Sequence, residues 1–367
     1  MVHGVRGDRR TRAPVAPRAA YGVEPVAHTV PMVGVSGIGS WPGSDIRDAL
    51  QVVRDELTEA PEGVTVTPYL PELPDRGPGA DLVGRSLGLL VDLPVDLQPQ
   101  GWRLVDHRGR DAERTASLWG QDLDQMAEVF DGWTGPFKVQ VAGPWTLAAA
   151  AWLPLGDRVL SDPGATRELA ESLGDGIAEH LATVHRLLPG AQPVLQVDEP
   201  TLPAVLLGRI RSESGYRTLR APDPSHAEAV LRGVLDAARR AGAETTVVHC
   251  CGDHPPLALL RGSGADALAI DTTTFGPRAW ESVAETVESG VRLWAGVLPT
   301  AGEPPAPDDV VDPLVGRWRE VGLEASRLDE VTVTPACGLA AATPDQALGT
   351  TRAAVAVART LAEQALG

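Results

Sequence analysis

The chain has 367 residues, of which 43% are hydrophobic and 22% are charged, so it can build a large buried core and is not a disordered polymer. Its net charge of −17 excludes nucleic acid and an anionic membrane surface as main partners, because both would repel such a protein. No run of about 18 apolar residues is present, so we expect no membrane-spanning helix.

The N-terminal segment differs in composition from the rest of the chain. Residues 1–31 are rich in Arg, Pro and Gly and lack the apolar centre of a secretory signal, so they predict a disordered basic tail. Residues 32–367 are then expected to form one domain. An odd number of cysteines, three, argues against a disulfide framework and favours a reducing compartment, so a cytoplasmic protein is expected.

From Met32 onward, short apolar segments alternate with longer amphipathic ones. Each short segment is followed by a turn and a helix-like stretch, and repeated βα units imply a parallel sheet. We therefore expect an α/β fold, a single (β/α)8 barrel of the TIM type. Residues 68–120 do not follow the alternation and predict an insertion or a long loop over one mouth of the barrel. The predicted strands are residues 33–39, 137–143, 194–200, 245–250, 267–271, 292–297 and 331–335.

Three of the predicted helices have recognisable start signals. Asp162 is a candidate N-cap in front of a proline, and Ser225 with Glu228 has the spacing of a capping box. That second helix is expected to stop at Gly242. Thr343 opens the last helix, which runs nearly to the end of the chain.

Polar residues suited to chemistry lie at the ends of the predicted strands or shortly after them. In a barrel, the carboxyl ends of the strands gather at one face, where active sites are built, so residues distant in sequence should converge there. This convergence is a stronger signal than any single short motif in the chain. The residues concerned are Ser40, Asp198, His249, Cys251, Asp271 and Cys337.

The sequence His249-Cys250-Cys251 ends one of these strands. Alternate strand residues share a face, so His249 and Cys251 should point together while Cys250 packs in the opposite direction as a small hydrophobe. Cys337 could supply a third ligand and the Asp271 carboxylate a fourth, a donor set that suits zinc. From these residues alone, buried structural cysteines remain the alternative.

Five motifs occur along the chain in a fixed order: IGSWP (38–42), GPWTL (143–147), QVDEP (196–200), HCC (249–251) and PACGL (335–339). In sequence and order they resemble segments of the catalytic half of cobalamin-independent methionine synthase, from about residue 33 to the C-terminus. Those enzymes have a second, N-terminal barrel that this chain is too short to contain. The chain therefore resembles the short single-barrel relatives in the superfamily that also holds uroporphyrinogen decarboxylase.

The resemblance implies a zinc site and four ligands. In the family, a histidine and a cysteine in H-x-C, a glutamate after the next strand and the cysteine of C-G-L bind zinc. Here these positions are His249, Cys251, Asp271 and Cys337. Asp271 departs from the family pattern, because aspartate is one methylene shorter than glutamate.

The resemblance also implies an amino-acid acceptor. Ser40 corresponds to a residue that contacts the acceptor's carboxylate, and Asp198 to a catalytic-site residue that holds its ammonium group. A carboxylate beside an ammonium makes a charge-assisted hydrogen bond, which suits this role. The resemblance implies that the protein transfers a methyl group to a thiol. By similarity to the family, this thiol is homocysteine and the product is methionine.

The methyl donor implied by the resemblance is a methylated folate or a methyl-corrinoid protein. Three family groups lack a counterpart here. A second acidic partner of the ammonium falls near Gly84, a glutamate that meets the pterin ring is replaced by Ala204 or a neighbour, and no histidine follows residues 292–297. The alternatives are a uroporphyrinogen decarboxylase-like enzyme, which needs no metal, and a zinc-binding barrel without catalysis.

Overall fold

A computed structural model describes residues 1, 32–59 and 61–365 of the chain. The predicted tail, residues 1–31, therefore lies outside the described residues except for Met1. Among the described residues, none of the helices combines the length and the apolar composition that crossing a bilayer would require.

Eight parallel strands form one sheet, ordered β2-β1-β10-β9-β8-β7-β6-β5. The sheet is nearly closed, because the segment after β2 bonds to β5: the Lys138 backbone N–H donates to Pro68 O (2.8 Å) and its carbonyl accepts from Leu70 N (3.0 Å). The expected α/β barrel is confirmed. The strands are β1 (Val33–Ser36), β2 (Val64–Thr67), β5 (Gly135–Ala142), β6 (Ala191–Asp198), β7 (Thr245–Cys250), β8 (Ala267–Asp271), β9 (Arg292–Leu298) and β10 (Val331–Pro335).

The strand β2 is the one member of this sheet that the alternation of βα units did not predict. Its residues 64–68 read Val-Thr-Val-Thr-Pro, the same five residues as 331–335 in β10. The two copies flank β1 on opposite sides, with Val35 in register with Val66 on one side and Val333 on the other. The same sequence of valines and threonines, residues that favour strands, therefore pairs with β1 in the same register on both of its sides.

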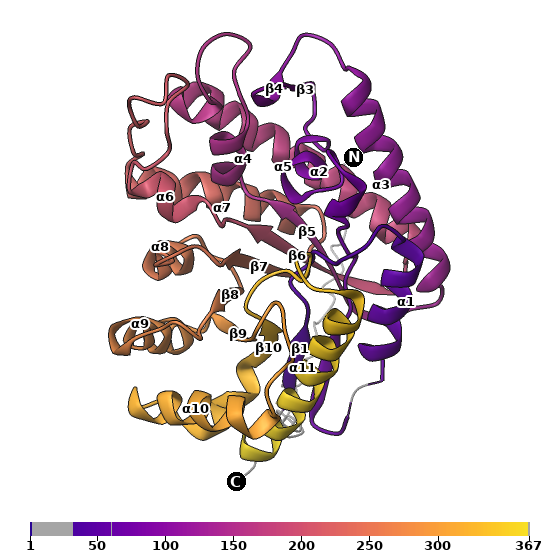
Figure 1. The fold of residues 1–367 in the computed structure, drawn as a ribbon, viewed down its shortest axis with the longest axis vertical. Coiled ribbons are helices and arrows are strands. Elements are labelled where there is room, and N and C mark those ends of the chain that lie inside the picture. Colours follow the sequence, from indigo (N-terminus) through magenta and orange to yellow (C-terminus); the bar gives the residue numbers. More distant parts are fainter. Residues whose placement is uncertain (2–31, 60, 366–367) are drawn as a thin grey trace. The chain divides into compact units, whose positions relative to one another are not determined.

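Helices surround the strands (Figure 1). The predicted caps of the helices that begin at Pro163 and Pro344 are present, since Asp162 accepts from Gly164 N and Thr343 accepts from Gln346 N. The helix predicted to be capped by Ser225 instead has Asp223 as its N-cap, because Pro224 already occupies the first helical position. The main barrel helices are α1 (Ile46–Glu56), α3 (Arg110–Val129), α4 (Pro144–Ala150), α5 (Pro163–Leu187), α6 (Leu202–Leu206), α7 (Pro224–Arg240), α8 (Leu257–Gly262), α9 (Pro277–Glu288), α10 (Pro307–Glu320) and α11 (Pro344–Ala365).

The irregular segment 68–120 is an insertion with elements of its own. It holds the short helices η1 (Pro74–Arg76) and α2 (Leu82–Leu87), the antiparallel pair β3 (Val95–Gln98) and β4 (Gly101–Leu104), and the start of α3. Ser86 Oγ accepts from the backbone N–H of Ala142, the last residue of β5 (2.7 Å). The insertion is therefore attached at the carboxyl end of β5.

A buried ion cluster ties this insertion to α3. The Asp122 carboxylate is fully buried and pairs with Arg76 (Nη1–Oδ1 2.7 Å) and with Arg85, whose guanidinium also lies 3.7 Å from the ring centroid of Trp119. Removing one partner from such a cluster leaves buried charge without compensation.

We expect Asp122→Ala to destabilise the protein by roughly 3–5 kcal/mol, because two largely buried guanidinium groups lose their carboxylate. Urea unfolding measures this change. The matched control is Glu128→Ala, which breaks the exposed Glu128–Arg47 pair and should change the midpoint very little. An Asp122 variant as stable as this control would contradict the expectation.

Candidate metal centre

The residues singled out in the sequence lie at the carboxyl ends of five strands. Asp198 and Asp271 are the last residues of β6 and β8. His249 is the next-to-last residue of β7, and Cys251 follows that strand directly. The remaining two follow strands at a short distance: Ser40 comes after β1 and Cys337 after β10.

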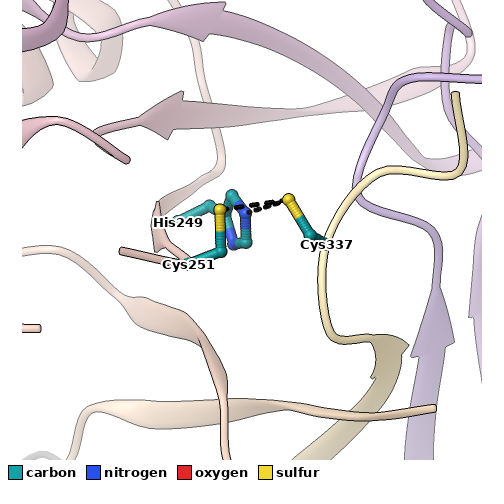
Figure 2. Close-up of side chains that lie close together, drawn as sticks. All are labelled: His249, Cys251 and Cys337. Atoms are coloured by element: carbon teal, nitrogen blue, oxygen red, sulfur yellow. Dashed lines mark hydrogen bonds between the residues drawn. The ribbon is translucent and has the colours of Figure 1, made fainter. Parts of the chain in front are cut away.

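Three of the four predicted metal ligands meet at one point. The ligand atoms of His249, Cys251 and Cys337 all lie within 4.8 Å of one another. Cys337 Sγ is 3.0 Å from Cys251 Sγ and 3.8 Å from His249 Nε2 (Figure 2). Cys250 is fully buried in the hydrophobic core and takes no part in the group. The side chains thus alternate along β7 as a strand requires.

The ring of His249 is held in an orientation that suits a ligand. Its Nδ1 lies 3.0 Å from the Ala269 carbonyl, which can only accept a hydrogen bond. Nδ1 therefore carries a proton, and Nε2, which faces the sulfurs, is the ring nitrogen available to a metal, the arrangement usual for metal-binding histidines. Burial lowers the pKa of His249, but the hydrogen bond to Cys337 and the charge of Asp198 outweigh it, so the net direction is upward.

The two thiols of the group share a proton. The hydrogen bond from Cys251 lowers the pKa of Cys337 to about 4, and the same bond raises the pKa of Cys251. One sulfur of the pair is therefore readily a thiolate, the form that binds metal. Two sulfurs and one imidazole nitrogen, half-buried to buried, fit the donor set of a zinc site.

The fourth predicted ligand, Asp271, is not part of this group. Its Oδ1 accepts hydrogen bonds from the backbone N–H (2.9 Å) and hydroxyl (2.6 Å) of Thr273. Asp271 nevertheless lines a cavity of about 410 Å³ together with Cys251. The reserve candidates Asp253 and His254 line the same cavity, and neither belongs to the His–Cys–Cys group.

Asp198 lies beside the group, buried at 3% exposure. Its Oδ1 accepts from Gln196 Nε2 (2.7 Å). Burial raises the pKa of Asp198 to about 6, against the opposing charges of His249 and Lys138. A buried carboxylate of this kind favours a ligand that brings a positive charge.

A second buried carboxylate, Glu72, was missed in the sequence. It is 3% exposed, and its Oε1 has no hydrogen-bond partner among the described residues. Burial raises its pKa to about 7; the positive charge of Arg85 opposes this shift, and the nearby charge of Asp198 adds to it. Glu72 follows β2, so predicting that strand would have marked it as an acidic residue at a strand end.

Gly84, the position near which a second acidic partner was sought, lies elsewhere in the insertion. It is in α2, and a Cβ there would come within 2.7 Å of the Gly79 backbone. No side chain fits at this position without a shift of the main chain.

Ser40 and its neighbours connect Glu72 to the turn that carries Cys337. The Ser40 carbonyl accepts from Leu339 N (2.8 Å), and a Cβ on Gly338 would lie 1.9 Å from Ser40 Oγ, so a larger residue there would force the Ser40 hydroxyl to move. The residues flanking Ser40 bond to the backbone of Glu72 on the other side. Ser40 thus lies between Glu72 and the turn that carries Cys337.

An eight-stranded parallel barrel with a His–Cys–Cys group and the buried carboxylates of Asp198 and Glu72 at its carboxyl ends is the architecture of a barrel enzyme with a candidate metal centre. The chain belongs to the family of cobalamin-independent synthase catalytic domains, whose model matches residues 33–360. Membership of this family supports a methyltransferase. No curated protein matches the chain.

Solved structures show more distant likenesses. A B12-independent methionine synthase from Shewanella sp., in complex with selenomethionine, is 14% identical over 72% of this chain and 71% of that chain, with a TM-score of 0.49. A β-galactosidase from the psychrophilic Marinomonas ef1 is 14% identical over 89% of this chain and 58% of that chain, with a TM-score of 0.41. With TM-scores below 0.5, neither likeness bears on the function of this chain.

We expect the purified protein to bind about one zinc ion per chain, and Cys251→Ser or Cys337→Ser to reduce that content strongly, because each removes a sulfur of the group. Metal analysis after dialysis measures it. Cys250→Ala is the matched control, since Cys250 lies in the core outside the group. Equal zinc in all three variants would rule out this site.

Proposed function

We propose that the chain is a zinc-dependent S-methyltransferase that transfers a methyl group to homocysteine and forms methionine. One observation carries the proposal: His249, Cys251 and Cys337 converge within 4.8 Å at the mouth of the barrel, next to buried carboxylates. A decarboxylase of the sister family would leave this group of sulfurs without a use. The reduced thiols that the site needs fit a cytoplasmic enzyme.

The metal site in this proposal is formed by His249, Cys251 and Cys337, with Asp271 as a fourth ligand once it leaves Thr273. Bound zinc supplies a positive charge that ionises a thiol and holds it as the nucleophilic thiolate. The Ala269 carbonyl keeps His249 Nε2 directed at the site. Two thiolates and a carboxylate make the ligand set electron-rich, which keeps an acceptor sulfur reactive.

Three side chains of the protein bind the ammonium and carboxylate groups of the acceptor in this proposal. In our proposal Asp198 and Glu72 receive its ammonium group, since both are buried and Glu72 Oε1 lacks a partner among the described residues. Ser40, on the turn beside them, contacts its carboxylate. The thiol end then points toward Cys337, whose turn is bonded to Ser40 through Leu339.

The methyl donor in this proposal is a methylated corrinoid on another protein, in preference to a methylated folate. Ala204 in α6 has no group for a pterin ring, and the segment 299–305 after β9 contains no histidine to donate a proton. Thiol activation depends on neither of these positions. The acceptor half of the reaction is thus the part that the described residues support.

We expect the zinc-loaded protein to form methionine from homocysteine when methyl-corrinoid and methyl-folate donors are compared side by side. Asp198→Asn should lower kcat/KM about 100-fold, because the ammonium loses a charged partner. Mass-spectrometric detection of methionine measures the rate. Homocysteine should also change the zinc X-ray absorption edge; an unchanged edge and no methionine would favour a non-catalytic zinc protein.

We expect methionine to bind more tightly as the pH rises. Glu72 has a pKa raised to about 7 by burial, with Arg85, Lys138 and Asp198 as its charged neighbours. Below that pH Glu72 is neutral and cannot pair with an ammonium, so affinity should rise roughly tenfold between about pH 6 and about pH 8. Calorimetric titration at several pH values measures this change.

The matched variant for this test is Glu72→Gln, which keeps the shape of the side chain and removes its ionisation. It should bind methionine weakly at every pH and show a flatter profile. A wild-type profile as flat as that of the variant would exclude Glu72 from the ammonium site.

A further inference from the structure

Lys138, the single lysine of the chain, lies inside the barrel. It is fully buried, and its ammonium donates to the Ile38 carbonyl at 2.6 Å. Its other neighbours are Gln140 Oε1 at 3.4 Å and the ring of Tyr69, whose centroid is 5.0 Å away. A buried ammonium is costly unless it makes strong interactions, so its position calls for a physical reason.

The Ile38 carbonyl receives two donors from neighbouring strands. Lys138 reaches it from β5, and Gln196 Nε2 reaches it from β6 at 2.8 Å. The same Gln196 nitrogen also donates to Asp198. Side chains of two neighbouring strands, β5 and β6, therefore hold the turn after β1 in place. Both bond to the same atom, the carbonyl oxygen of Ile38.

The turn held in this way, residues 38–41, is bonded both to Glu72 and to the segment that carries Cys337. Gly39 O accepts from Glu72 N (3.1 Å), and Trp41 N donates to Glu72 O (2.8 Å). Ser40 O accepts from Leu339 N, two residues beyond Cys337. A shift of the turn would therefore move Ser40 and Glu72 together, relative to His249 and Cys251 at the end of β7.

We propose that Lys138 is a positioning residue for the amino-acid acceptor: by holding the Ile38 carbonyl it keeps Ser40 and Glu72 where they receive the acceptor's carboxylate and ammonium. This inference rests on the proposed function, because it assumes an amino acid in the site. The Lys138 ammonium also interacts through its charge with the carboxylates of Asp198 and Glu72. Burial lowers its pKa to about 7 and the two carboxylates oppose that shift, so their charges help to keep the ammonium charged.

The test is Lys138→Met, which keeps the length of the side chain and removes its charge and its donor. Zinc-loaded protein should bind methionine roughly 10- to 100-fold more weakly, because a charge-assisted hydrogen bond that shapes the site is lost. Zinc content should stay at about one per chain. The melting temperature should be unchanged or higher, because a buried charge is replaced by an apolar group.

Two matched variants accompany it. Lys138→Arg keeps a charged donor and should recover part of the affinity. Arg47→Met removes a cation from the exposed surface of α1 and should leave methionine binding unchanged. Wild-type affinity in Lys138→Met would overturn the inference, as would a loss of zinc equal to the loss of methionine binding.

A second measurement does not depend on any variant. In untagged protein grown with [ε-13C]lysine, the spectrum contains one lysine resonance, that of Lys138. Saturating methionine should shift this resonance, since the turn that Lys138 holds contacts the ligand. An unshifted resonance at saturation would overturn the inference. Wild-type protein that binds neither methionine nor homocysteine would instead refute the proposed function.

Discussion

The parallel pairing of eight strands is the constraint on which the rest of this structure depends. Because every neighbouring pair runs in the same direction, all carboxyl ends meet at one rim. A histidine on β7 and a cysteine 88 residues later, after β10, then approach to 3.8 Å. No local segment of the chain could bring these groups together. The chemistry of the rim is thus a product of the topology.

Hydrogen bonds of one turn connect the groups at this rim. The turn after β1 is bonded to Glu72 on one side and to Leu339, near Cys337, on the other. The packing is tight where this turn meets the segment that carries Cys337, because a Cβ on Gly338 would lie 1.9 Å from Ser40 Oγ. The His–Cys–Cys group and the buried carboxylates are therefore connected through the hydrogen bonds of this turn.

The sequence was informative where a pattern is local. Apolar runs followed by polar residues predicted seven strands, and the alternation of side chains predicted that His249 and Cys251 share a face. It was less informative where tertiary contacts decide. Glu72 is acidic, but nothing local marks it as buried, and its strand β2 was not predicted. The hydrogen bonds of Asp271 to Thr273 likewise depend on the shape of a loop.

The burial of Lys138 has a consequence for the outer surface. With no other lysine in the chain, every cationic side chain outside the barrel, apart from protonated histidine, is a guanidinium. Guanidinium groups keep their proton throughout the range in which proteins are stable. The surface therefore responds to alkalinity without losing positive charge, and reagents that acylate side-chain amines find no exposed target on it.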